Sequence, residues 1–325
     1  MAPSQHPIFL AGPTAVGKSA VALALAGKIG GEIITVDSMQ VYRGLDIGTA
    51  KPMAEERRRV PHHLLDICDL SEAFDAAQFA RLAQTAVAGI RSRGRTPIFC
   101  GGTGLYFKAF LEGVGEAPPG DANLRAELEA APLGQLLAEL HERDPATFER
   151  IDRQNPRRVV RAVEVVRLTG KPFSAQKSQW GGHPCEPPSA GDDGSRGRLP
   201  HQRLVCFTRP AEEQHQRINA RVDEMFARGL VDETRGLLKR GLAENKFAMQ
   251  AIGYRQVVEH LRGERGLAET MELVKTRTRQ FAKRQLTWFR RHGNGAWVEL
   301  KPGETMGETI GKLLPASPFA REAKP

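Results

Sequence analysis

A glycine-rich stretch near the start of the chain has the residue types and spacing of a phosphate-binding loop. Residues 12–19 read GPTAVGKS and match the pattern G-x-x-x-x-G-K-[ST]. In that pattern backbone N–H groups converge on an anion at the start of a helix. The lysine adds a positive charge on the terminal phosphate, and the hydroxyl holds Mg²⁺. The sequence therefore predicts a phosphate site with Lys18 as the cation and Ser19 as the metal ligand.

A carboxylate and a hydroxyl follow two apolar runs further along the chain. Asp37 comes directly after residues 32–36, and Thr103 lies in GGTG after residues 96–100. A kinase would normally place an acid at the second position to hold its metal, but that run ends in Gly-Gly-Thr. Ligands of open α/β sheets bind beyond the carboxyl ends of the strands. Asp37 and Thr103 are therefore expected to face the phosphate loop.

The elements that must position these residues alternate between strand and helix. Apolar runs and helical spacing predict strands at residues 8–11, 32–36, 96–100 and 204–207, and helices at residues 18–29 and 74–90. Such alternation is typical of a parallel sheet with both faces covered. The predicted fold class is therefore α/β, with a P-loop-type parallel sheet core flanked by helices.

A second region of different character interrupts this core. EAPPGD follows Gly113, and helical spacing then predicts helices at about residues 121–131, 133–142 and 156–168. The twenty residues 181–200 include eleven Gly, Pro or Ser, a composition that cannot bury a core. We expect a helical insertion domain at 114–200 within a core of 1–113 and 201–325, whose last part forms helices at 217–228, 231–238 and 269–291.

Composition limits the class of protein and its partners. The chain has 325 residues and a net charge of +9, and residues 273–292 contain seven Lys or Arg and no acid. This basic run fits a polyanionic partner, although a solvated helix face is the plainer alternative. Widely spaced cysteines argue against a disulfide framework or a zinc site. With no run of about 18 apolar residues, we expect a soluble, cytoplasmic protein without a membrane segment.

Six blocks occur in order between about residues 7 and 292: GPTAVGKS, VDSMQVYRGLDIGTAKP, PHHLLDI, GGTGLY, AIGYRQ and TRQFAKRQLTWFRR. Together they resemble the tRNA dimethylallyltransferase (isopentenyltransferase) family. The resemblance implies prenyl transfer from dimethylallyl diphosphate to N6 of the adenosine 3′ of the anticodon in tRNA. The phosphate loop and Mg²⁺ would hold the departing diphosphate. Asp37 would act as general base, with Thr103 assisting at the leaving group.

The resemblance also implies which residues bind each substrate. For two of the residues, the arginines 217 and 221 one helical turn apart, a solvated helix face is an equal alternative. The implied diphosphate contacts are Gly12, Pro13, Thr14, Ala15, Val16, Gly17, Lys18, Ser19, Arg217 and Arg221. The implied tRNA contacts are Asp37, Ser38, Met39, Gln40, Thr103, Arg125, Arg157, Arg158, Arg161, Gln250, Gly253, Tyr254, Arg255, Arg279, Lys283 and Arg284.

Three other groups of residues have a structural interpretation beside a functional one. A metal site at His62, His63 and Asp66 lacks a third histidine, so hydrogen bonding is favoured. Asp46 and Lys51 lie in a family motif that also reads as a turn. In the last basic helix, Met271, Val274, Phe281 and Trp288 are predicted to form the packed face, opposite Arg277, Arg284 and Arg291.

Other functions remain open from the sequence. The same prenyl chemistry on a free adenine nucleotide would not need the basic helices. A kinase for a small metabolite would transfer a phosphoryl group, and an RNA-binding protein with a vestigial loop would not need Lys18, Ser19, Asp37 and Thr103 together. Contact with tRNA offers binding surface without a second subunit, so we expect a monomer.

Overall fold

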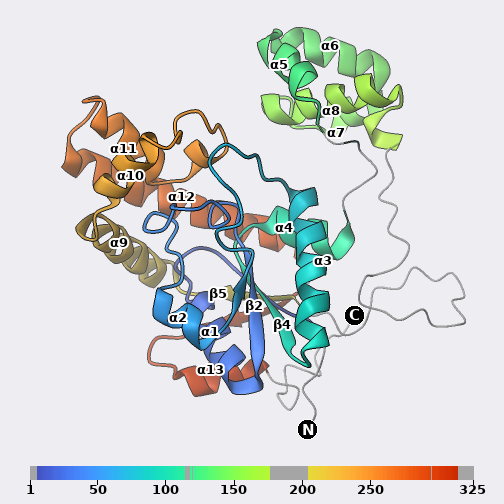
Figure 1. Cartoon of the computed structure of the whole chain (residues 1–325). Coiled ribbons are helices and arrows are strands. Elements are labelled where there is room, and N and C mark those ends of the chain that lie inside the picture. The colour runs from blue at the N-terminus through green and yellow to red at the C-terminus, as the bar shows by residue number, and fades with distance from the viewer. Residues whose placement is uncertain (1–5, 114–117, 119, 176–203, 294, 314–325) are drawn as a thin grey trace, which may run out of the picture. The chain divides into compact units, whose positions relative to one another are not determined.

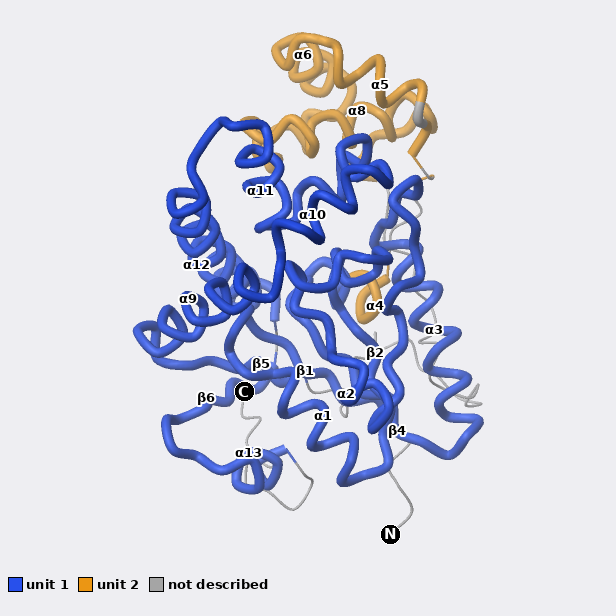
Figure 2. The backbone as a smooth tube through the Cα atoms, turned by 60° about the vertical axis from the view of Figure 1, so that its left-hand side comes forward, with its two compact units in different colours: residues 1–108, 187–325 blue, residues 109–186 orange. Residues whose placement is uncertain are grey.

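The computed structural model describes residues 6–113, 118, 120–175, 204–293 and 295–313 (Figure 1). The chain divides into two compact units (Figure 2). Unit 1 comprises residues 1–108 and 187–325, and unit 2 comprises residues 109–186. The Gly/Pro-rich stretch 181–200 and the predicted domain boundary at 200 lie outside the described residues, so that part of the domain prediction stays a prediction.

Unit 1 is built on a six-stranded sheet in the order β3-β2-β4-β1-β5-β6, and every neighbouring pair is parallel. The strands are β1 (Ile8–Ala11), β2 (Gly31–Val36), β3 (His62–His63), β4 (Thr96–Gly101), β5 (Leu204–Thr208) and β6 (Ala296–Glu299). The predicted α/β class with a parallel core is confirmed. The sequence missed β3 and β6, which are short and are not continuous apolar runs.

Helices flank this sheet in Figure 1. Those of the core are α1 (Lys18–Ile29), α2 (Ala54–Arg59), α3 (Ala76–Ser92), α4 (Gly104–Glu112), α9 (Ala211–Ala227), α10 (Leu230–Leu238), α11 (Tyr254–Leu261), α12 (Leu267–His292) and α13 (Met306–Leu313). Of these, α10 and α11 lie away from the strands and pack on other helices (Figure 1). Val21 and Leu25 of α1 join Leu10, Ile98 and Phe207 of the strands in one apolar cluster. Burial of this cluster fixes α1, and with it the phosphate loop, against the sheet.

Unit 2 is a small helical unit with its own core. Its helices are α5 (Ala122–Ala130), α6 (Leu133–Arg143), α7 (Pro145–Arg150) and α8 (Pro156–Thr169). The predicted ends of α8 are found: the Asn155 side chain accepts a hydrogen bond from the Arg158 N–H, and Gly170 is left-handed. The core consists of Leu128, Leu136, Leu140, Val159, Val160, Ala162 and Val163.

The predicted packed face of the last basic helix is partly wrong. Val274 is buried in α12, but Phe281 is 37% exposed. Ala282, Gln285 and Phe289 lie buried instead. The prediction rested on apolar residues repeated mainly at intervals of seven along α12. The side that is buried depends instead on the elements that α12 contacts, which include α9 and α11.

A membrane span would need a long apolar helix. Within the described ranges, none of the helices combines that length with that hydropathy.

Candidate active site

Three adjacent strands of unit 1 end at one edge of the sheet and place the predicted site residues in a row. The register aligns Ala11 of β1 and Val36 of β2 with the same residue of β4, Gly101. The phosphate loop, Asp37 and Gly102 therefore follow at the same level. The Val36 carbonyl accepts hydrogen bonds from the N–H groups of Gly102 and Thr103, both at 3.2 Å, which joins the ends of β2 and β4.

Backbone geometry explains the two glycines of the phosphate loop. Gly12 and Gly17 have φ values of 149° and 113°, where side chains are rarely accommodated. A Cβ atom at Gly12 would also lie 2.9 Å from the Phe207 carbonyl oxygen of the neighbouring strand. The loop thus approaches β5 closely before it enters α1, whose first residue is Lys18.

Three cations surround this loop without a carboxylate partner. The Lys18 Nζ atom donates to the Pro13 carbonyl at 3.0 Å, and the Arg217 Nε atom donates to the Ala15 carbonyl at 2.9 Å. Burial lowers the pKa of Arg221, and the charge of Arg217 lowers it further. None of the ion pairs between described residues involves Lys18, Arg217 or Arg221. The loop therefore carries positive charge that no described carboxylate contacts directly.

Asp37 is a partly buried carboxylate beside this charge. Its Oδ1 atom accepts hydrogen bonds from the N–H groups of Met39 at 2.8 Å and Gln40 at 3.2 Å. Burial raises the pKa of Asp37, although these two hydrogen bonds and the charges of Lys18 and Lys51 oppose the shift. Asp37 follows β2 and the phosphate loop follows β1, and both strands end opposite Gly101 of β4, so the acid and the loop leave the sheet at the same level.

Thr103 joins the same cluster through its hydroxyl. The Thr103 Oγ1 atom accepts a hydrogen bond from the Ser38 N–H at 3.2 Å. Ser38 follows Asp37, so the hydroxyl after β4 and the carboxylate after β2 are held together. Gln40 supports the turn from the other side, because its Nε2 atom donates to the Thr49 carbonyl at 2.9 Å.

Residues 42–51 form a turn around a buried lysine. The Lys51 Nζ atom donates to the Tyr42 carbonyl at 2.6 Å and pairs with Asp46 at 2.9 Å and with Asp66. Asp66 also pairs with Arg57 at 2.7 Å. Lys51 is only 7% exposed, so these partners offset the cost of burying its charge.

The favoured interpretation of the two histidines, hydrogen bonding within the protein, is found in the structure. The His63 Nε2 atom lies 2.6 Å from a Glu32 carboxylate oxygen, and the His62 Nδ1 atom lies 2.8 Å from the Val60 carbonyl oxygen. The described part of the chain holds no group of three or more His, Cys, Asp or Glu side chains suited to a metal ion.

The segment 250–255 contributes both to a pocket and to packing. Gln250, Arg255 and Arg284 line a hollow of about 510 Å³ together with Ile252, Gln256, Glu259, Arg265, Leu273 and Arg277. Tyr254 does not: its side chain is fully buried, and its hydroxyl donates to Glu233 and accepts from the Gly48 N–H at 3.1 Å. The implied contact of RNA with the Tyr254 side chain is therefore not available in this structure.

The implied RNA contacts of α12 differ in how freely they face solvent. Lys283 and Arg284 are exposed, whereas Arg279 donates to the Asn219 side chain at 2.6 Å and to the Thr276 hydroxyl at 2.9 Å. Arg284 lies with its guanidinium carbon 5.9 Å from the Phe281 ring centroid. Lys283 and Arg284 thus have the freer charges.

The arginines implied in unit 2 fall into two classes. Arg125 and Arg161 both pair with Glu164, each at 2.6 Å, and Glu164 is fully buried. Arg157 and Arg158 are exposed near the start of α8. Glu164 thus occupies Arg125 and Arg161, whereas Arg158 is exposed and is not part of that pairing.

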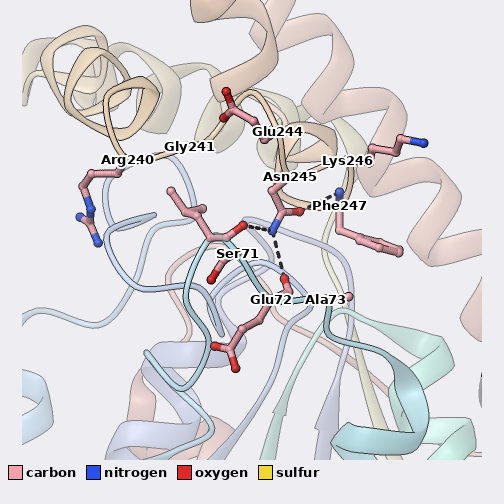
Figure 3. Close-up of a pocket in the computed structure, with 10 residues that line it drawn as sticks. Ser71, Glu72, Ala73, Arg240, Gly241, Glu244, Asn245, Lys246 and Phe247 are labelled. Carbon is pink, nitrogen blue, oxygen red and sulfur yellow. Dashed lines mark hydrogen bonds between the residues drawn. The ribbon is translucent and has the colours of Figure 1, made fainter. Parts of the chain in front are cut away.

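A further hollow of about 410 Å³ is lined by none of the predicted site residues. It lies between residues 70–73 and 240–247 (Figure 3). Asn245 joins these two segments, because its Nδ2 atom donates to the carbonyls of Leu70 at 2.7 Å and Glu72 at 3.1 Å. Its Oδ1 atom accepts from the N–H groups of Phe247 and Ala248. All the hydrogen-bonding atoms of the Asn245 side chain thus serve the fold.

Comparison with known proteins identifies the family to which this chain belongs. The family model for IPP transferase matches residues 40–292, which is more than half of the chain. The chain belongs to the IPP transferase family. It is 48% identical to the tRNA dimethylallyltransferase of Geobacter metallireducens over 91% of this chain and 93% of that protein. It is 46% identical to the tRNA dimethylallyltransferase of Halorhodospira halophila over 89% and 91%.

Solved structures of this family have the same fold. The full-length tRNA isopentenylpyrophosphate transferase of Bacillus halodurans matches with a TM-score of 0.66 and 37% identity, covering 95% of this chain and 94% of that one. A eukaryotic dimethylallyltransferase, solved in snapshots of its action on tRNA, matches with a TM-score of 0.76 and 27% identity, covering 99% and 82%. The expected membership of this family and the expectation of a prenyl-transferring enzyme are confirmed.

Three side chains that hold the phosphate loop of this IPP transferase were missed by sequence reasoning. Gln214 donates to the Thr14 carbonyl at 2.9 Å, Arg209 donates to the Val16 carbonyl at 3.1 Å, and Gln285 accepts from the Thr14 N–H at 2.8 Å. Gln214 and Gln285 lie on the buried sides of α9 and α12. The signal in the sequence was a glutamine at a buried position of a helix. A buried amide needs hydrogen-bond partners, so such a glutamine indicates a polar contact inside the protein.

Proposed function

We propose that this chain transfers a dimethylallyl group from dimethylallyl diphosphate to N6 of the adenosine 3′ of the anticodon in tRNA. Prenyl transfer to tRNA is the general reaction of its family. The observation that carries the finer proposal is the pairing of a phosphate loop, beside three cations that form no ion pair between described residues, with an acid of raised pKa. The loop and its cations suit binding of a diphosphate, and a carboxylate with a raised pKa suits a general base that works near neutral pH.

The proposed step breaks the bond between the allylic carbon and the diphosphate oxygen. The diphosphate leaves with the electron pair, and the N6 lone pair forms the new bond to carbon. The N6 proton passes to the Asp37 carboxylate, so no net charge is left on the purine. Because cationic character develops at the allylic carbon, stabilising the departing anion is the larger electrostatic contribution.

Residues of this chain supply that stabilisation in the proposal. Lys18, Arg217 and Arg221 neutralise the diphosphate, and the loop N–H groups donate to its oxygens. Thr103 accepts from Ser38, and we assign its hydroxyl hydrogen to an oxygen of the leaving group. The structure favours the functional interpretation of Arg217, because its Nε atom already lies on the loop.

A magnesium ion fits the residues present if the diphosphate provides most of its ligands. Mg²⁺ prefers one or two protein oxygens together with substrate phosphates and water. The Ser19 hydroxyl, at the start of α1, is the oxygen that would hold it. When bound, the ion would neutralise charge on the departing diphosphate.

Recognition of RNA follows from the free charges of unit 1 in this proposal. Neither Arg277 nor Arg284 takes part in an ion pair between described residues, and both line the 510 Å³ hollow beside α11. Phosphates of the tRNA would bind there and fix its register, while the acceptor adenine leaves its stack to reach Asp37.

Mass spectrometry tests the reaction directly. Purified protein is mixed with dimethylallyl diphosphate, Mg²⁺ and unmodified tRNA, and the RNA is then digested to nucleosides. Adenosine should gain one five-carbon unit. Replacing tRNA by adenosine monophosphate, or the prenyl donor by ATP, should give no product. Prenylated nucleotide or ATP turnover would instead support the rival acceptor or the kinase.

Substitution of Asp37 tests its role as base. Asp37→Asn keeps a side-chain oxygen for the N–H groups of Met39 and Gln40, so the turn is retained. Turnover should fall about 10²–10⁴-fold while the Kd for tRNA stays within a few-fold. Asp69→Asn, at an exposed acid paired with Arg43, is the matched control. Normal turnover with weak tRNA binding in Asp37→Asn would remove this residue as the base.

A further inference from the structure

Gln285 on α12 connects two parts of the site that are far apart in the sequence. Its Oε1 atom accepts from the Thr14 N–H at 2.8 Å, and its Nε2 atom donates to the Gly102 carbonyl at 2.9 Å. The side chain is 8% exposed, so little water competes for either hydrogen bond. One amide therefore joins the phosphate loop to the end of β4.

The GGTG turn is shaped to accept this helix. A Cβ atom at Gly102 would lie 2.2 Å from the Gln285 Nε2 atom, and one at Gly104 would lie 2.1 Å from the Trp288 ring. Residues 285 and 288 are nearly one helical turn apart and lie on one side of α12. The two glycines thus allow close approach of α12, which brings the Gln285 amide within reach of the Gly102 carbonyl.

Four carbonyl groups of the loop accept hydrogen bonds from side chains as well. Lys18, Gln214, Arg217 and Arg209 donate in turn to the carbonyls of the four consecutive residues 13–16, at 3.0, 2.9, 2.9 and 3.1 Å. Among the described residues, Gln285 is the side chain that accepts a hydrogen bond from an amide of this segment, the N–H of Thr14. These contacts fix the orientation of each peptide group, and with it the direction in which the remaining N–H groups point.

We propose that Gln285 is a positioning residue, which sets the location of the phosphate loop relative to Asp37 and Thr103. The link runs from Thr14 through the amide to Gly102, whose neighbour Thr103 is joined to Ser38. This inference rests on the proposed function, because it assigns the loop to the diphosphate. Loss of the amide lets the loop shift, so the diphosphate binds less tightly and the allylic carbon is less well placed for attack.

Two variants disturb this amide from opposite sides. Gln285→Met keeps the length of the side chain but removes both hydrogen bonds. Gly102→Ala keeps the glutamine but displaces its amide, and Gly102 has an ordinary backbone conformation that alanine can adopt. Gln216→Met, at an exposed position on α9, is the control.

Calorimetry with pyrophosphate and Mg²⁺ measures the first consequence. Both variants should weaken pyrophosphate binding about tenfold. Both should raise KM for dimethylallyl diphosphate and lower kcat, with the Kd for tRNA within twofold of the parent. The double variant should be little worse than either single variant, because both act on one link. Gln216→Met should behave as the parent.

The outcomes separate this inference from the function on which it rests. If the parent protein does not bind pyrophosphate, the proposed function fails. If the parent binds and both variants bind equally well, with only a lower Tm, Gln285 is structural and the inference fails. Should Gln285→Met not fold, Gly102→Ala alone decides between these results.

Discussion

The basic residues of α8 in unit 2 and those of α12 in unit 1 look alike in the sequence but are used differently. On α8, Arg161 joins Arg125 in pairing with the fully buried Glu164. On α12, Arg277, Lys283 and Arg284 take part in no ion pair between described residues. A count of arginines therefore does not measure the charge available to a polyanion.

The difference follows from what each helix must bury. Unit 2 encloses a carboxylate, whose burial is costly unless cations and hydrogen bonds surround it. Besides its two arginines, Glu164 accepts a hydrogen bond from the Asp121 N–H at 3.1 Å. In contrast, α12 buries a neutral amide, Gln285, and its Lys275 pairs only with the exposed acids Asp223 and Glu272 among described residues, so no buried charge has to be compensated there. Pairing of Arg161 on α8 serves folding, whereas the free charge on α12 is available for the tRNA binding that we propose.

The largest test of this contrast is removal of the buried charge. Glu164→Ala leaves Arg125 and Arg161 without their partner and should destabilise unit 2 by about 3–5 kcal/mol. Hydrogen exchange across residues 121–169 measures the loss. Glu149→Ala, at an exposed acid 3.5 Å from Arg153, should change protection there by less than about 0.5 kcal/mol. Equal effects of the two substitutions would show that Glu164 does not organise the unit.

Acid should weaken unit 2 through the same residue. Burial raises the pKa of Glu164, but hydrogen bonds from Arg125 and Arg161 outweigh it and hold that pKa below its usual value. The pKa of Asp144, another buried acid of unit 2, is also lowered, because hydrogen bonds from Thr147 and Ser174 outweigh its burial. A lowered folded-state pKa contributes stability above the unfolded-state value, and this stability is lost as the pH falls through the folded-state value.

Hydrogen exchange between about pH 5 and pH 2 follows this loss, since Asp and Glu have unfolded-state pKa values near 4. Protection of residues 121–169 should decline over that range in the parent and decline less in Glu164→Ala. An identical pH dependence in the two proteins would assign the acid sensitivity to other groups.

Much of the core could be predicted because its signals are local. The phosphate loop and the N-cap of α8 are patterns of a few adjacent residues, and β1, β2 and β4 are short segments rich in apolar residues. The pairing of charges could not be predicted in this way. Arg125 lies 39 residues from Glu164, and Thr14 lies 271 residues from Gln285, so only the folded chain shows which polar groups meet.

The burial of one candidate site residue, Tyr254, could not be predicted from its motif either. The family resemblance implied an RNA contact for Tyr254, yet its hydroxyl donates to Glu233 and accepts from the Gly48 N–H inside the protein. Its place in the segment 250–255, which was expected to contact RNA, did not reveal that Tyr254 is buried. Tyr254, Val257 and Val258 are spaced as the buried face of a helix, which would have predicted α11.

On the α12 side, Arg284→Gln should weaken binding of every tRNA about tenfold at 0.15 M salt. The slope of log Kd against log salt should flatten by about one unit, as expected for one lost phosphate contact. Arg161→Gln is the matched change in unit 2. It should lower the protection of residues 121–169 and alter tRNA affinity by less. If Arg284→Gln weakened the binding of some tRNA sequences much more than others, Arg284 would not be a phosphate contact.

Substitution of Arg158 should have the smallest effect of these changes. Arg158 lies on α8, as Arg161 does, but it is exposed and forms no ion pair between described residues. Arg158→Gln should therefore leave the stability of unit 2 within about 0.5 kcal/mol, as for most surface substitutions. If α8 binds RNA through its unpaired charges, tRNA affinity should fall about threefold. A loss of stability instead would mean that Arg158 belongs with Arg161, and α8 would then contribute to the fold of unit 2 alone.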